Sequence, residues 1–98
     1  MDSNGYNPSV LQDKQECWIC GHQGELVRHE VFHGAYRQKS KKLGTWVLLC
    51  TRCHYEVHFG SVSADKHLKR KAEKILLGQG WTEEKFRDVF GKSYLEIW

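Results

Sequence analysis

The chain has 98 residues, of which 40% are hydrophobic, and its mean hydropathy is −0.64. This length suits one small domain with a thin core, and such domains often need a metal or disulfides for stability. No apolar run approaches the roughly 18 residues of a membrane-spanning helix. The first residues also lack the cationic start and apolar stretch of a secretory signal. We therefore expect a cytoplasmic chain in a reducing environment, with no membrane partner.

The net charge of +3 is unevenly distributed along the chain. Residues 1–30 carry a net charge of −3, residues 31–74 carry +7 and residues 75–98 carry −1. A local excess of this size suits a polyanionic partner, of which nucleic acid is the usual example. A basic helix face that contacts only water would have the same composition, so charge alone leaves both interpretations open.

The first segment of the chain differs in character from the rest. Residues 1–14 are polar, contain the only proline and show no periodicity, which predicts a flexible N-terminal arm. We expect residues 15–98 to form a single domain. Within it, residues 17–60 hold all four cysteines and five of the six histidines, and residues 61–98 form a helical C-terminal extension.

Two short strands are predicted in the cysteine- and histidine-rich part. Residues 26–32 are rich in β-branched and aromatic residues and end before Gly34. Residues 45–49 have the same character and lead directly into Cys50. Between them, residues 37–42 form a basic loop or a short helix.

Helices are predicted over the remainder of the chain. His54 and His58 are four residues apart and therefore lie on one face of a helical turn. A longer helix is expected over residues 64–77, with Ser63 as its N-cap. A last helix is expected to start at Thr82, to run to Phe90 and to be closed by Gly91. The fold class is therefore a small α+β domain stabilised by zinc.

The four cysteines form two Cys-x-x-Cys pairs, Cys17 with Cys20 and Cys50 with Cys53, which are separated by 29 residues. In a chain that is not secreted, this spacing favours one tetrahedral zinc ion over two disulfides or four unrelated thiols. Zinc bound by four thiolates has no open coordination position, so the site is structural. Its binding free energy can reach about 10 kcal/mol, which would compensate for the thin core.

A second group of candidate ligands remains once the zinc is satisfied. His29 and Glu30 lie in the first predicted strand, and His54 and His58 follow the second cysteine pair. A hairpin covered by a helix whose first turn faces it would bring the three histidines around one point. The sequence therefore predicts a second metal site next to the first.

These segments carry a resemblance to a known family. The motifs are CWIC at 17–20, HEVFHG at 29–34 and LLCTRCH at 48–54, together with Arg37, Ser40 and His58. They resemble the HNH endonuclease family with the ββα-metal fold, and more narrowly the small HNH proteins of bacteriophages and prophages. The similarity covers about residues 17–60, and the ending around residues 90–95 also resembles the phage group. The resemblance implies a ββα-metal core over residues 17–60.

The resemblance further implies metal-dependent hydrolysis of DNA phosphodiester bonds, by nicking or cutting with low sequence specificity. In the family, two residues that end the first strand supply a metal ligand and a general base, and His29 and Glu30 occupy this place. His54 and His58 match the remaining ligand positions. Many members have Asp-His or His-His where this chain has His29-Glu30, so three assignments stay open. His29 is the ligand and Glu30 the base, or His29 is the base and Glu30 supports the metal, or a ligand comes from elsewhere in the chain.

The implied catalytic ion is divalent. Histidine-rich ligation suits Mn²⁺, Ni²⁺ or Zn²⁺ better than Mg²⁺. Arg37 would contact the phosphate at the cleaved bond, because one guanidinium group can donate two parallel hydrogen bonds to the oxygens of a phosphate. DNA is the expected partner, with other phage proteins as further candidates and a monomer or a dimer as the assembly. The expected nucleic-acid contacts are Arg37, Lys39, Lys41, Lys42, Lys69 and Arg70.

A second function fits part of the same evidence. The chain could be a non-catalytic zinc module that binds nucleic acid or a protein, since Glu30 and Thr45 depart from the family pattern; many members have Asn at the position of Thr45. The cysteine pairs and the basic segment fit both functions. A binding module has no need of His54 and His58 after the second cysteine pair, and this favours the enzyme.

Overall fold

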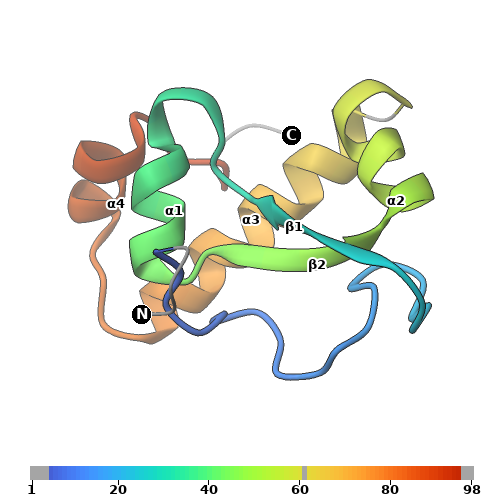
Figure 1. Cartoon of the computed structure of the whole chain (residues 1–98). Coiled ribbons are helices and arrows are strands. Elements are labelled where there is room, and N and C mark those ends of the chain that lie inside the picture. The colour runs from blue at the N-terminus through green and yellow to red at the C-terminus, as the bar shows by residue number, and fades with distance from the viewer. Residues whose placement is uncertain (1–4, 61, 96–98) are drawn as a thin grey trace.

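The computed structural model describes residues 5–60 and 62–95. Figure 1 shows a two-stranded hairpin at the centre, with helices behind it and at both of its ends. The elements are β1 (Leu26–Glu30), η1 (Gly34–Tyr36), α1 (Arg37–Leu43), β2 (Trp46–Cys50), α2 (Thr51–Tyr55), the π-helical segment η2 (Glu56–Gly60), α3 (Val62–Gly78) and α4 (Glu83–Phe90). The predicted α+β class is confirmed. None of the described helices combines the length and apolar character that crossing a membrane would require.

The hairpin presents one face to the helices and the other to the N-terminal segment. β1 and β2 pair in antiparallel fashion, with Leu26 opposite Cys50 and Glu30 opposite Trp46. Because side chains alternate along a strand, His29 and the opposing Val47 share the face that is turned inward. Both are buried, and α3 crosses behind this face (Figure 1).

Residues 5–14 cover the opposite face of the hairpin, which differs from the flexible arm that the sequence predicts over residues 1–14. The amide of Val10 donates to the carbonyl of Gly44 at 2.8 Å, and the amide of Leu48 donates to the side chain of Gln12 at 2.6 Å. Tyr6 is buried with its ring against Trp46. The segment covers apolar strand surface and hydrogen-bonds along the free edge of β2. Residues 1–4 lie outside the described part of the chain.

An aromatic cluster joins the end of β1 to α4. The Phe32 ring lies 4.1 Å from the Phe90 ring and 5.5 Å from the Phe86 ring, measured between centroids, and all three side chains are buried. On α3, the apolar stripe consists of three buried side chains, Leu68, Ala72 and Leu76. The buried side chains of these helices therefore form one core with the hairpin.

The ends of α4 agree with the prediction from the sequence, whereas the start of α3 and the end of β1 differ from it. The Thr82 hydroxyl accepts a hydrogen bond from the Lys85 amide at 3.0 Å, and Gly91 closes α4 with a φ of +88°, as the sequence predicts. α3 begins at Val62, so Ser63 lies inside the helix and is not its N-cap. β1 ends at Glu30, two residues before the predicted end of the strand, because the chain turns there toward α1.

Ser40 holds the chain at the point where β1 ends. Its side chain is fully buried, and its hydroxyl donates to the Phe32 carbonyl at 2.8 Å and accepts from the Phe32 amide at 3.1 Å. A single side chain on α1 thus satisfies both backbone groups of Phe32. This arrangement fixes the direction in which the chain leaves the strand that carries His29.

Replacing Ser40 with Ala should lower the free energy of unfolding by about 2 kcal/mol, because it leaves two buried backbone groups of Phe32 without partners. Urea unfolding followed by far-UV circular dichroism measures the change. Ser63→Ala is the matched control: Ser63 is exposed, so its loss should change stability by less than about 0.5 kcal/mol. Equal stability of the two variants would contradict the role assigned to Ser40.

Candidate metal centres

The first cysteine pair lies in a tight turn that precedes the hairpin. The Gly21 amide donates to the Cys17 carbonyl at 2.9 Å, and Gly21 has a φ of +79°, which glycine adopts without strain. The Trp18 amide donates to the Leu48 carbonyl at 2.8 Å. This hydrogen bond attaches the turn to β2 and places it beside the second cysteine pair.

The second pair lies where β2 passes into α2. Cys50 is the last residue of the strand, and its sulfur accepts a hydrogen bond from the Cys53 amide at 3.5 Å in the first turn of the helix. The sulfur of Cys20 lies 3.7 Å from that of Cys50, and the four sulfurs all lie within 4.8 Å of one another. Two zinc–sulfur bonds of about 2.3 Å at a tetrahedral angle place their sulfurs about 3.8 Å apart. The four cysteines can therefore bind a structural metal such as zinc.

The electrostatics of the cysteine cluster favour a bound cation. Burial raises the pKa of the Cys17 thiol, but hydrogen bonds from the backbone of Cys20, Cys50 and Ile19 outweigh burial and lower this pKa to about 6. Burial, followed by the neighbouring thiols of Cys50 and Cys17, raises the pKa of Cys53. Four crowded sulfurs cannot all ionise unless a positive charge compensates them, and a metal ion supplies that charge.

Three histidines form the second cluster. His29 comes from β1, His54 from α2 and His58 from η2, and their ligand atoms lie within 4.8 Å of one another. The His29 ring centroid is 4.9 Å from that of His58 and 5.5 Å from that of His54. The Nε2 atoms of His54 and His58 are 3.0 Å apart. The structure thus brings together the three histidines that the sequence singles out.

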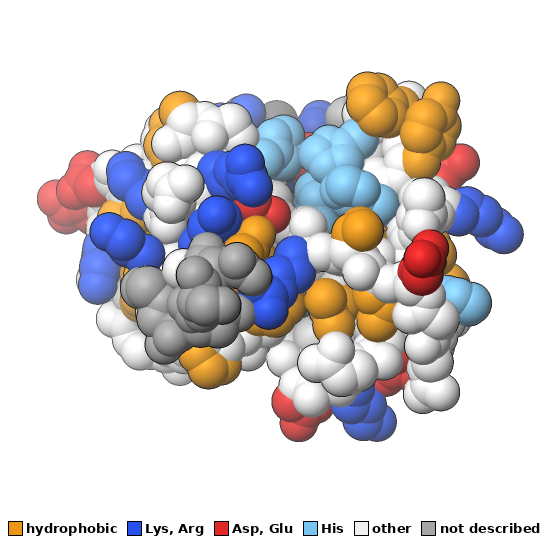
Figure 2. Space-filling view, in the orientation of Figure 1, with side chains coloured by type: hydrophobic (Ala, Val, Ile, Leu, Met, Phe, Trp, Pro, Cys, Tyr) orange, Lys and Arg blue, Asp and Glu red, His pale blue; other side chains and the backbone are white. Residues whose placement is uncertain are grey.

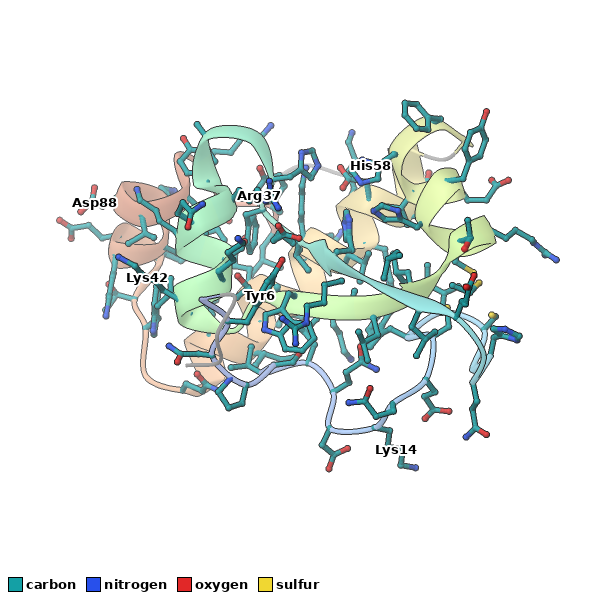
Figure 3. All side chains as sticks on the ribbon, in the orientation of Figure 1. Tyr6, Lys14, Arg37, Lys42, His58 and Asp88 are labelled. Carbon is teal, nitrogen blue, oxygen red and sulfur yellow. The ribbon has the colours of Figure 1, made fainter. Side chains whose placement is uncertain are left out.

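The burial of these histidines differs, and the difference matters for binding. His29 is only 2% exposed, and its Nε2 is buried without a hydrogen-bond partner. His58 is exposed, so the cluster opens to solvent on that side (Figure 3). An unpartnered buried nitrogen is costly, and a metal ion would satisfy it. The donor set fits a divalent transition-metal ion that keeps open coordination positions.

His29 and His54 are held in the form that binds metals. Burial is the main cause that lowers the pKa of His29 to about 4, with further lowering by His58, His54 and His33. Burial also lowers the pKa of His54, with a smaller contribution from His58. Both imidazoles are therefore neutral near pH 7, and a neutral imidazole has a nitrogen lone pair available for a metal.

Glu30 does not join the three histidines, although the sequence makes it a candidate ligand. Successive side chains of a strand point to opposite faces, so Glu30 points away from the face that carries His29. Its carboxylate accepts a hydrogen bond from Nε of Arg37. Among the described residues, the group of close ligand atoms contains the histidines and not this carboxylate. Glu30 therefore orients Arg37.

The separation of Glu30 from the three histidines gives a prediction for metal affinity. Glu30→Gln should weaken Ni²⁺ binding at the histidine cluster by less than about tenfold, because Glu30 is not a ligand. His54→Ala should weaken Ni²⁺ binding by about 100-fold or more, because it removes a ligand and the loss of an outer-sphere partner alone costs about 10–100-fold. Isothermal titration with Ni²⁺, on protein whose cysteine cluster is already loaded with zinc, measures both. A loss in Glu30→Gln as large as that in His54→Ala would make Glu30 a ligand after all.

Two further residues lie beside the histidine cluster. The His33 ring is 5.5 Å from that of His58, and its Nε2 lies 3.5 Å from Oδ1 of Asp65 on α3. The same carboxylate accepts a hydrogen bond from Lys69 at 2.8 Å. No motif in the sequence marks Asp65, because its position depends on how α3 packs behind the hairpin.

The basic residues expected to contact nucleic acid are not equally accessible. Arg37 is 59% exposed and lies on the same side of the molecule as His58 in Figure 3. Lys69 is only 13% exposed and is paired with Asp65, and Lys39 donates to the Val89 carbonyl at 2.9 Å. Lys42 is exposed on α1. The described cations of α1 therefore suit a phosphate backbone better than Lys69 does.

The two clusters share one short helix. Cys53 and His54 are consecutive residues of α2, so a metal held by the cysteines fixes the first turn of the helix that carries His54. This gives the cysteine cluster a positioning role for the histidine cluster.

Comparisons with protein-family models, curated proteins and solved structures found no match for this chain.

Proposed function

We propose that the chain is a divalent-metal-dependent endonuclease of the HNH type, in which β1, β2 and α2 form a ββα-metal core. The observation that carries the proposal is the convergence of one ring nitrogen each from His29, His54 and His58, together with the buried, unpartnered Nε2 of His29. A non-catalytic zinc module would need the cysteine cluster but would have no use for this second, solvent-accessible group.

The histidine cluster would hold the catalytic ion. Bound there, a divalent ion supplies stabilisation of the negative charge that develops during phosphodiester hydrolysis. Buried His29 provides a fixed nitrogen, and half-buried His54 on α2 and exposed His58 on η2 provide two more. Mn²⁺, Ni²⁺ and Zn²⁺ suit three imidazole ligands better than Mg²⁺ does.

Arg37 would bind the phosphate next to the ion. Glu30 holds its Nε, and the guanidinium is 59% exposed, so its solvent-facing N–H groups can donate to phosphate oxygens. With the lysines of α1, these contacts are to the DNA backbone and carry little sequence information. We therefore propose low sequence specificity and binding that weakens steeply with salt. A bacterial cytoplasm, where thiols stay reduced and phage DNA is present, is the setting that fits this activity.

Nicking of supercoiled plasmid tests the proposal. The protein is incubated with plasmid and Mn²⁺, Ni²⁺ or Mg²⁺, with and without a chelator, and open-circular DNA is quantified on a gel. We expect nicking that requires the added ion and is stronger with Mn²⁺ or Ni²⁺ than with Mg²⁺. Failure to nick DNA with any of these ions, in folded protein that contains zinc, would reject the nuclease function.

A further inference from the structure

Two large aromatic side chains are exposed next to the histidine cluster. Tyr55 is 62% exposed and Phe59 is 78% exposed, and their ring centroids lie 5.2 Å apart. We call this pair the aromatic ledge. Leaving two such rings in water forgoes the free energy that their burial would give. A flat apolar ligand that covers the aromatic ledge would therefore bind with a gain in free energy.

The ledge is continuous with the proposed catalytic site. Tyr55 and Phe59 each follow a histidine of the cluster, His54 and His58, so that the two pairs lie on adjacent faces of the helical segment formed by α2 and η2. The Phe59 ring centroid is 6.0 Å from that of His58. Figure 2 shows hydrophobic side chains over this end of the molecule, next to the histidines, and a group of lysines and arginines on the other side of the histidines, over α1.

The charges around the ledge indicate which part of a nucleic acid would lie there. Arg37 is on the α1 side of the histidine cluster, where a phosphate would be bound. On the ledge side, exposed Arg52 lies three residues before Tyr55 on α2, and exposed Glu56 directly follows Tyr55. These two charges have opposite signs, so the ledge has no net charge that would select a phosphate, and its rings can stack on a base. Two rings are also too small for a stable protein interface, which needs about 800 Å² on each partner, yet large enough for one or two bases.

We propose that the aromatic ledge stacks unpaired bases of a DNA strand whose phosphate lies at the histidine cluster, so that the protein prefers single-stranded DNA over duplex. This rests on the proposed nuclease function. In a duplex, the bases are paired and stacked within the helix, so their faces are not available to Tyr55 and Phe59. In a single strand, the base next to the bound phosphate is free to reach the ledge.

Fluorescence anisotropy tests the proposal, with a labelled oligothymidylate and a duplex of the same length and without added divalent ion, so that neither is cut. Phe59→Ala should weaken binding of the oligothymidylate by about tenfold, and by much more than binding of the duplex. Phe59→Leu should behave like Phe59→Ala because leucine lacks a π face. Phe59→Trp should bind the oligothymidylate as well as the parent protein does, and the bases should quench the emission of its indole. Val27→Ala removes an exposed apolar side chain of β1 and should affect neither ligand.

Other outcomes would overturn the proposal. Equal weakening of both DNA forms in Phe59→Ala, or no weakening of either, would show that the ledge does not stack bases. Loss of self-association in Phe59→Ala, measured by sedimentation, with unchanged oligothymidylate affinity would make the ledge a protein contact. Plasmid nicking by the parent protein distinguishes these results from a failure of the nuclease proposal. If the protein nicks plasmid but the anisotropy results are negative, only the base-stacking role of the aromatic ledge is rejected.

Discussion

Removing the metal from the cysteine cluster is expected to unfold the chain. A structural zinc ion contributes on the order of 10 kcal/mol, and domains of this size have total stabilities of about 5–15 kcal/mol. Cys17 and Cys53 are buried in the core that α3 and the hairpin share, so loss of the ion also leaves crowded thiols inside. A strong chelator should abolish the far-UV circular dichroism signal of the helices, and Cys17→Ala should fail to fold.

Metal content and reversibility provide the controls for this result. Adding excess zinc after the chelator should restore the helical signal, and a metal assay should find one tightly held zinc ion per chain. Mild chelation should remove an ion from the histidine cluster alone and leave the helices intact. A chain that stays fully folded after all metal has been removed would show that the cysteine cluster is not a stabilising site.

Replacing His29 with Ala is expected to reduce plasmid nicking by at least about 100-fold, because loss of a metal ligand exceeds the effect of its outer partners, which is about 10–100-fold. His29 is the one buried member of the histidine cluster, and its Nε2 is buried without a hydrogen-bond partner. Nicking rates at saturating protein and a fixed Mn²⁺ concentration measure the effect.

A second variant separates loss of the site from loss of the fold. His54→Ala removes a half-buried ligand without opening the core, and it should lose nicking while retaining zinc and its unfolding temperature. His67→Ala, which changes an exposed histidine of α3, is the matched control and should keep its rate within about twofold. If His29→Ala and His54→Ala both nick like the parent protein, the site lies elsewhere.

Local patterns in the sequence were sufficient for much of the architecture. The paired cysteines predicted the cluster of four sulfurs that can hold a metal, and the spacing of His54 and His58 placed both on one helical face. α4 begins and ends at the predicted capping residues. These features depend on residues that are close in the chain or on a ligand geometry that only a few spacings satisfy, so they can be inferred without a structure.

Contacts between distant residues could not be inferred in this way. The pairing of Glu30 with Arg37, in place of a metal, depends on the strand face that each residue occupies. The packing of residues 5–14 on the hairpin depends on apolar surface that exists only once β1 and β2 have paired.

The residues that can bind metal are thus identifiable from the chain alone, because ligand chemistry and short-range spacing do not depend on the fold. Which of these residues meet, and which side chains remain exposed, follows from how the elements pack. Asp65 reaches His33 because α3 packs behind the hairpin, and Phe59 remains in water because none of the described elements covers its face of η2. Such relations arise from long-range packing, in which each contact depends on the position of every neighbouring element.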